Sequence, residues 1–152
     1  MKMNCSIRST RHYRHWIAAT ISLLCGVTCG CGDGRPDLAA VSGRVTIDGQ
    51  PLTKGSISFI PAKGRQAGGA IESDGRYVLT CFEKGDGAIL GDYKVAVNGV
   101  EYLSETLLKW HAPKKYSNPA TSGLTAAIDG PRDDLNFELS WDGGKPFEEK
   151  TR

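Results

Sequence analysis

The stretch Val41-Ser-Gly-Arg-Val-Thr-Ile-Asp-Gly-Gln-Pro-Leu52 decides the fold class. Residues 41, 43, 45 and 47 fall on one face and the more polar residues 42, 44 and 46 on the other, which is the alternation of a strand with one buried face. Asp48-Gly49 then predicts a tight hairpin turn, because such turns need residues that adopt positive φ angles. The stretch therefore predicts a strand followed by a reversal of the chain.

The same pattern recurs along the chain, with further strands predicted at residues 56–61, 76–81, 92–97, 124–128 and 135–141. The 19 glycines and 7 prolines among 152 residues suit short strands and tight turns better than a helix bundle. About seven short strands over some 100 residues predict an all-β fold, a β-sandwich of antiparallel sheets. Cys81 shares a face with Tyr77 and Leu79 and is expected to be buried.

Three segments depart from the strand pattern. Residues 101–111 predict one short helix packed across an edge of the sandwich, because apolar and aromatic residues recur there at helical spacing: Tyr102, Leu103, Thr106, Leu107 and Trp110. Residues 63–69 are basic and glycine-rich, and we expect a loop. Residues 142–152 are charged, and we expect a frayed tail.

Residues 1–30 have the three parts of a secretory signal peptide: a basic segment, an apolar run at residues 16–27 and small residues before Cys31. The run of 12 residues is shorter than the roughly 20 that a membrane-spanning helix needs. This segment holds four of the 19 basic residues and none of the 17 acidic ones, so the remaining chain is slightly acidic. That charge argues against a nucleic-acid partner.

Gly30-Cys31 resembles the processing site of bacterial lipoproteins, in which a small residue precedes the lipid-modified cysteine. We therefore expect lipidation of Cys31, with residues 31–40 as a tether between the lipid and the domain. The expected location is the cell envelope, anchored in a membrane and facing the periplasm or the exterior. The alternative is an ordinary signal peptide cut near Cys31 and a freely secreted domain.

Three motifs carry a resemblance to a known family: the opening stretch, Ile57-Ser-Phe-Ile-Pro61 and Ser73-Asp-Gly-Arg-Tyr-Val-Leu-Thr80. Together they resemble the carboxypeptidase regulatory-like, or transthyretin-like, domain, in which a V-x-G-x-V-x-x-D-G-x-P strand and turn precede a D-G-x-Y/F-x-L hairpin. Residues 82–95 and 113–125 are similar to small planctomycete-type bacterial lipoproteins that carry this domain. The resemblance covers about residues 25–140. It implies a seven-stranded prealbumin-like sandwich over residues 41–141, used as an accessory or anchored module, with no catalytic residues to carry over.

The sequence offers few groups for catalysis or metal binding. His111 is the only histidine after the predicted signal peptide, and no serine lies in a Gly-x-Ser-x-Gly elbow. Gly85-Asp86-Gly87 is expected to build a turn rather than a calcium site. Cys81 and His111 are too few ligands for zinc. We expect no enzyme, no cofactor and no metal, with a hydrolase as a minor alternative.

Two functions therefore lead. The first is a lipid-anchored, non-enzymatic β-sandwich module with a structural or interaction role, whose partner is an envelope protein or a polysaccharide. The second is a carbohydrate- or peptide-binding module that uses residues 101–123. Trp110 and Trp141 are expected in the core. Tyr116 is expected to be exposed, and with Lys114 and Lys115 it forms the candidate ligand contact.

Overall fold

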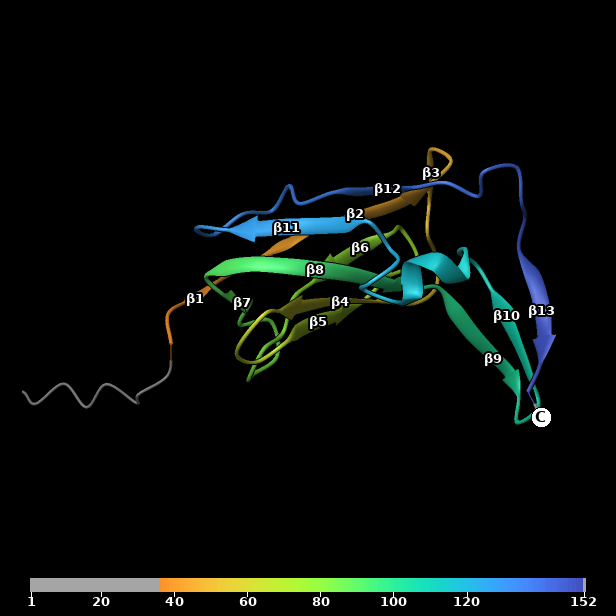
Figure 1. The fold of residues 1–152 in the computed structure, drawn as a ribbon, viewed down its shortest axis with the longest axis horizontal. Coiled ribbons are helices and arrows are strands. Elements are labelled where there is room, and N and C mark those ends of the chain that lie inside the picture. Colours follow the sequence, from red (N-terminus) through yellow and green to blue (C-terminus); the bar gives the residue numbers. More distant parts are fainter. Residues whose placement is uncertain (1–35, 152) are drawn as a thin grey trace, which may run out of the picture. The chain divides into compact units, whose positions relative to one another are not determined.

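The computed structural model describes residues 36–151, which form an all-β fold with several antiparallel sheets (Figure 1). The predicted fold class is confirmed at this level. The predicted signal peptide and Cys31 lie outside the described residues. Between residues 36 and 151, no helix has the length and apolar character needed to span a membrane.

The described residues contain thirteen strands and one 3-10 helix. In chain order these are β1 (Leu38–Ala39), β2 (Ser42–Ile47), β3 (Gln50–Pro51), β4 (Ser56–Pro61), β5 (Ala67–Ala70), β6 (Arg76–Val78), β7 (Ala88–Ile89), β8 (Gly91–Asn98), β9 (Val100–Ser104), β10 (Leu107–Trp110), η1 (Lys114–Ser117), β11 (Leu124–Ile128), β12 (Phe137–Leu139) and β13 (Phe147–Lys150).

One sheet of the sandwich has the strand order β11-β8-β4-β5, and all its pairs are antiparallel. Its longest pairing joins β4 to β8, from Ser56 opposite Asn98 to Pro61 opposite Tyr93. Alternate residues of these strands, such as Phe59 and Val95, are fully buried, as the period-two pattern predicted.

The other sheet is built around β2, which pairs with β12, β3 and β6. The predicted turn is confirmed, because Asp48 and Gly49 both have positive φ angles, 48° and 78°, and join β2 to β3. β12 pairs with β2 in parallel, so the expectation of purely antiparallel sheets is wrong for this pair. The chain reaches β12 from β11 at the other sheet's edge, and it then runs in the same direction as β2.

The two sheets meet where β5 approaches the end of β6. Gly68 and Thr80 exchange two backbone hydrogen bonds, of 3.0 and 2.8 Å. A Cβ atom on Gly69 would lie 2.3 Å from the carbonyl oxygen of Val78, so only glycine permits this approach. The expected loop at residues 63–69 is therefore wrong for residues 67–69, since the glycines there serve a close strand contact.

The core lies between the two sheets and is centred on Phe59. Its ring contacts those of Tyr77, Tyr93 and Phe137, with centroid distances from 5.8 to 6.2 Å. Cys81 is 5% exposed, which confirms its predicted burial beside Tyr77 and Leu79.

The predicted helix over residues 101–111 is wrong, because these residues form β9 and β10. β10 lies between β9 and β13 in a third sheet of order β13-β10-β9. Residues 147–150, expected to fray, are thus the strand β13. The partner strand β13, about 40 residues further along the chain, supplies backbone hydrogen bonds to β10. The local spacing of apolar residues does not reveal this pairing.

The folded unit also begins earlier than expected. Leu38 and Ala39, placed in the tether by the sequence, form β1 and pair with β7. Ala39 is almost completely buried. The tether expectation is therefore wrong for these two residues.

Candidate functional site

The candidate ligand-contact residues Lys114, Lys115 and Tyr116 lie together on η1, which follows Pro113 and leads toward β11. The two lysines are partly exposed. Tyr116 is only 7% exposed and belongs to the core cluster. The expectation that Tyr116 is exposed is therefore wrong, and its ring is not available to a ligand.

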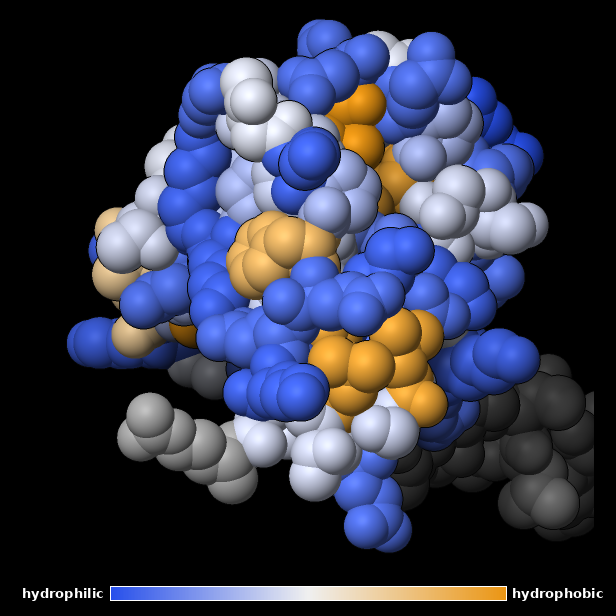
Figure 2. Space-filling model, turned by 90° about the vertical axis from the view of Figure 1, so that its right-hand side faces the viewer, coloured by the Kyte–Doolittle hydropathy of each residue, from blue (hydrophilic) through white to orange (hydrophobic). Residues whose placement is uncertain are grey.

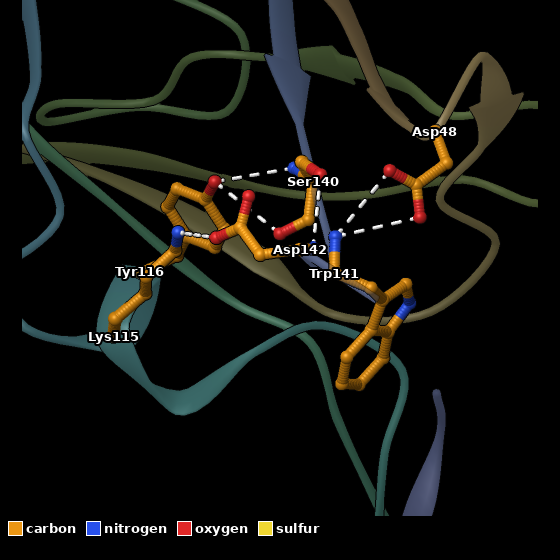
Figure 3. A network of polar contacts seen from close by, with 6 residues as sticks. All are labelled: Asp48, Lys115, Tyr116, Ser140, Trp141 and Asp142. Atoms are coloured by element: carbon orange, nitrogen blue, oxygen red, sulfur yellow. Dashed lines mark hydrogen bonds and ion pairs between the residues drawn. The ribbon is translucent and has the colours of Figure 1, made fainter. Parts of the chain in front are cut away.

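Tyr116 connects η1 with the segment directly after β12 (Figure 3). Its hydroxyl oxygen accepts a hydrogen bond from the Ser140 amide at 3.1 Å, and the hydroxyl lies 3.5 Å from the Ser140 carbonyl oxygen. Beside it, the Asp48 carboxylate accepts a hydrogen bond from the Trp141 amide, with both oxygens at 3.4 Å. These contacts join η1, the β2–β3 turn and the end of β12 at one place.

Lys115 is paired with Asp142, and its ammonium lies 4.8 Å from the centroid of the Tyr116 ring. The hydrogen bond with Asp142 raises the pKa of Lys115, and the same bond lowers the pKa of Asp142. Both side chains are largely in solvent, so screening keeps the contribution of this ion pair to stability small.

Lys114 is held by the C-terminal strand. Its ammonium lies 2.6 Å from Glu149, whose other carboxylate oxygen accepts the Trp110 indole N–H at 2.9 Å. The bond from Lys114, followed by that from Trp110, lowers the pKa of Glu149. The ammonium also lies 5.3 Å from the Trp110 ring centroid and 5.7 Å from that of Phe147, within cation–π range.

The aromatic residues near Lys114 pack on one another. Trp110 and Phe147 are nearly parallel, at 16° and 6.2 Å between centroids, and Trp141 meets Phe147 edge-on at 6.5 Å. Trp141 is partly buried against the core, as expected. Trp110 is also partly buried, but it lies outside the core cluster and contacts Phe147, Lys114 and Glu149, so its expected place in the core is wrong. Sequence reasoning missed Phe147 and Glu149, because the short charged run around them gives no strand signal.

This arrangement places Lys114 over the aromatic pair. A sugar or peptide that stacks on Trp110 or Phe147 from that side must first displace the ammonium and its bond to Glu149. The predicted ligand-contact residues therefore connect η1 with two later segments: Lys114 contacts β13, and Lys115 and Tyr116 contact residues 140–142.

The same sheet also carries exposed apolar side chains. Five large apolar or aromatic side chains of the described residues are exposed, and three of them belong to β9 and β13: Tyr102 at 75%, Leu103 at 46% and Phe147 at 39%. Figure 2 shows this side of the molecule, where apolar patches lie among hydrophilic atoms. The sequence pattern had assigned Tyr102 and Leu103 to a packed helix.

One cluster of polar and charged side chains lies near the start of β9. The Glu101 carboxylate lies 2.8 Å from His111 Nε2 and 3.4 Å from Lys54 Nζ. The hydrogen bond with His111 is the largest influence on Glu101 and lowers its pKa, and Lys54 acts in the same direction. Both side chains thus contact the one acidic residue of this strand.

Asp86 organises the turn before β7, as expected. Its carboxylate accepts the backbone amides of Cys81, Phe82 and Glu83 at 2.7 to 2.9 Å. Burial acts to raise the pKa of Asp86, but these bonds outweigh it and hold the pKa below its ordinary value. Among residues 36–151, no group of three or more metal-ligating side chains is present.

A hollow of about 630 Å³ lies on the outer face of β4, β8 and β11. Its lining includes Ile60, Pro61, Lys94 and Thr125. These residues supply no pairing of a nucleophile with a base, so the hollow adds no candidate catalytic group.

Comparison of the chain with protein-family models, curated proteins and solved structures found no match.

Proposed function

We propose that the protein is a lipid-anchored, non-enzymatic module of the cell envelope that contacts other envelope components through the β9-β10-β13 sheet. The observation that carries the proposal is the exposure of Tyr102, Leu103 and Phe147 on one small sheet outside the sandwich. Apolar side chains grouped on a surface mark contact sites in proteins.

The position of this sheet suits an anchored protein. β1, where the described chain begins, lies at one end of the sandwich, and the β9-β10-β13 sheet lies at the other (Figure 1). The seven Cα–Cα steps from Cys31 to Leu38 reach at most about 25 Å when the chain is extended. A lipid on Cys31 thus keeps the β1 end near the membrane and leaves the small sheet accessible.

The proposal extends to the prealbumin-like type of sandwich and to the lack of catalysis. The Asp48-Gly49 turn after β2 and the turn at Gly75 before β6 support this part of the proposal. The one histidine of the described residues is paired with Glu101 rather than with a serine or cysteine. A carbohydrate- or peptide-binding role for residues 101–123 has less support, because Lys114 covers the aromatic pair and Tyr116 is buried.

The anchor is tested with the full chain expressed in a bacterium. Mass spectrometry of the membrane fraction is expected to show a chain that begins at Cys31 with added acyl mass. Cys31→Ser should leave the protein unprocessed or soluble, and Cys29→Ser is the matched control that should change little. Normal cleavage and membrane retention of the Cys31→Ser protein would rule the anchor out.

The contact surface is tested in the same cells. Tyr102→Ser with Leu103→Ser is expected to reduce the amount of other envelope protein recovered after chemical cross-linking, while Val78→Ser, at an exposed site on β6, should not. Equal recovery from both variants would contradict the proposed surface. A rise of the melting temperature with a polysaccharide or peptide would instead favour the second function.

A further inference from the structure

We propose that the hollow on the outer face of β4, β8 and β11 binds a phospholipid whose headgroup carries a phosphate and a primary ammonium. Lys94 holds the phosphate, and Asp92 holds the ammonium. The inference goes beyond the proposed contact surface, which belongs to a different sheet. It rests on the proposed function only in that the lipid anchor brings a membrane close to the hollow.

The strand register gathers the charged and apolar residues of the hollow on one face. Lys94 lies opposite Ile60 on β4 and opposite Thr125 on β11. Two residues earlier on β8, Asp92 lies opposite Ala127. Side chains that are directly opposite, or two residues apart on one strand, share a face of the sheet. The two charged side chains therefore stand on the middle strand, with shorter or apolar side chains on both sides.

The hollow suits an amphipathic ligand. Its volume of about 630 Å³ lies within the range of about 300 to 1,000 Å³ that is usual for ligand sites. Apart from the two charged residues, its lining is mostly apolar and includes Ile60, Pro61, Ala62 and Ala127. A ligand that covers this lining gains from the burial of apolar surface, provided that it also presents charged groups to β8.

Both charged side chains are available to a ligand. Lys94 and Asp92 are exposed, and within residues 36–151 neither side chain forms an ion pair or a hydrogen bond. Their Cα atoms lie about 7 Å apart, because each strand residue advances about 3.3 Å. Asp92 repels a ligand that carries only a phosphate, and Lys94 repels one that carries only an ammonium. A phosphate and an ammonium joined by a two-carbon link satisfy both side chains.

The residues at the hollow favour a primary over a quaternary ammonium. A primary ammonium donates N–H hydrogen bonds to the Asp92 carboxylate, and hydrogen bonds between charged groups are the strong ones. A quaternary ammonium has no N–H and is usually held by open aromatic faces. The aromatic residue at this hollow, Tyr93, is only 4% exposed and packs in the core. The Thr125 hydroxyl adds a donor for the phosphate.

The position of the hollow favours a lipid over a small soluble zwitterion. The Tyr93 hydroxyl donates a hydrogen bond of 2.7 Å to the Ile89 carbonyl of β7, and β7 pairs with β1 (Figure 1). The hollow therefore lies toward the end of the sandwich at which the described chain begins. A lipid on Cys31 would hold this end near the membrane. A soluble zwitterion without an acyl chain leaves the apolar lining uncovered.

The site is tested with residues 36–152, which form one compact unit with its own core. The probe is a short-chain lysophosphatidylethanolamine kept below its critical micelle concentration. We expect saturable shifts of the backbone amide resonances in residues 60–62, 92–94 and 125–127. The choline lipid of the same chain length should bind about tenfold more weakly or worse, because it has no N–H to donate to Asp92. Phosphoethanolamine, the headgroup without a chain, should also bind much more weakly.

Substitutions at exposed positions separate the two charges. Asp92→Asn should remove most of the preference for the ethanolamine lipid over the choline lipid. Lys94→Gln should weaken the binding of both lipids by about tenfold. Glu138→Gln, at an exposed site on β12 of the other sheet, is the matched control and should change neither affinity. Ala127→Phe, which places a ring in the hollow, should abolish the binding of both lipids.

Three results would overturn the proposal: no saturable shift at these residues, equal affinity for the ethanolamine and choline lipids, or equal affinity for the ethanolamine lipid and phosphoethanolamine. The titration uses a unit without Cys31 and without other envelope proteins, so it does not depend on the proposed function. A unit that fails to bind, while Tyr102 and Leu103 still govern cross-linking in cells, overturns the lipid site alone. A unit that binds, while the full chain carries no acyl mass at Cys31, overturns the anchor alone.

Discussion

The indole N–H of Trp110 donates a hydrogen bond of 2.9 Å to the carboxylate of Glu149, 39 residues further along the chain. Lys114 binds the other oxygen of the same carboxylate. Side chains thus hold β13 to β10 in addition to their backbone pairing. The C-terminal strand is therefore an integral part of the small sheet that carries the proposed contact surface.

Phe147→Ala is expected to loosen this strand. It removes the ring stacked on Trp110 and the edge contact with Trp141, and an aromatic pair of this kind contributes about 1 kcal/mol. Amide hydrogens of β13 should exchange faster, while those of β4 and β8 remain protected. Glu148→Ala, one residue further and exposed, is the control. Unchanged exchange in β13 would mean that the aromatic contact does not hold the strand.

Tyr116→Phe tests the attachment of η1. The variant removes the hydroxyl that bonds Ser140 and keeps the buried ring, so the free energy of unfolding should fall by about 1 kcal/mol. Tyr102→Phe, which alters a largely exposed ring, should cost close to nothing. Urea titration of both proteins gives the comparison. Equal stability of the two would contradict the role assigned to the Tyr116 hydroxyl.

The contrast between β2 and β9 shows how far sequence reasoning reaches. β2 could be predicted because its alternation, its Asp-Gly turn and its one buried face all lie within a few residues. In β9 and β10 the apolar residues also fit helical spacing, and the strand that decides between the two structures, β13, lies far along the chain. The burial of Tyr116 had no local signal either, because its partner is the backbone of Ser140.

Gly87→Ala is expected to be much more costly than Gly123→Ala. Both glycines have positive φ angles, 94° and 70°, so alanine costs about 1 to 2 kcal/mol at either place. A Cβ atom on Gly87 would also lie 1.8 Å from the Ala39 carbonyl oxygen, whereas Gly123 has nothing within 4 Å. The additional loss of stability in Gly87→Ala should come from separation of β1 from β7. The amide hydrogens of Ala39 and Ala88 should therefore exchange early with solvent. If thermal unfolding shows that the two variants lose equal stability, β1 does not pair with β7 as described.

Asp86 predicts a pH dependence of stability. Its pKa is held below the ordinary value of 3.8, so its contribution is fully present above pH 3.8 and is lost as the pH falls through the lower value of the folded state. Asp86→Asn keeps one acceptor and removes the charge. The stability difference between wild type and variant, measured in urea, should therefore narrow on acidification below pH 3.8. A difference that is constant between neutral and acidic pH would contradict the role of the carboxylate.

The central claim, that the β9-β10-β13 sheet is the contact surface of an envelope protein, is tested most directly by photo-cross-linking in intact cells. The full chain carries a photoreactive residue in place of Tyr102 or, as the control, of Val78, both exposed in the folded unit. The prediction is a discrete adduct with an envelope component from position 102, and little or none from position 78. No adduct at position 102, or the same adducts from both positions, would contradict it.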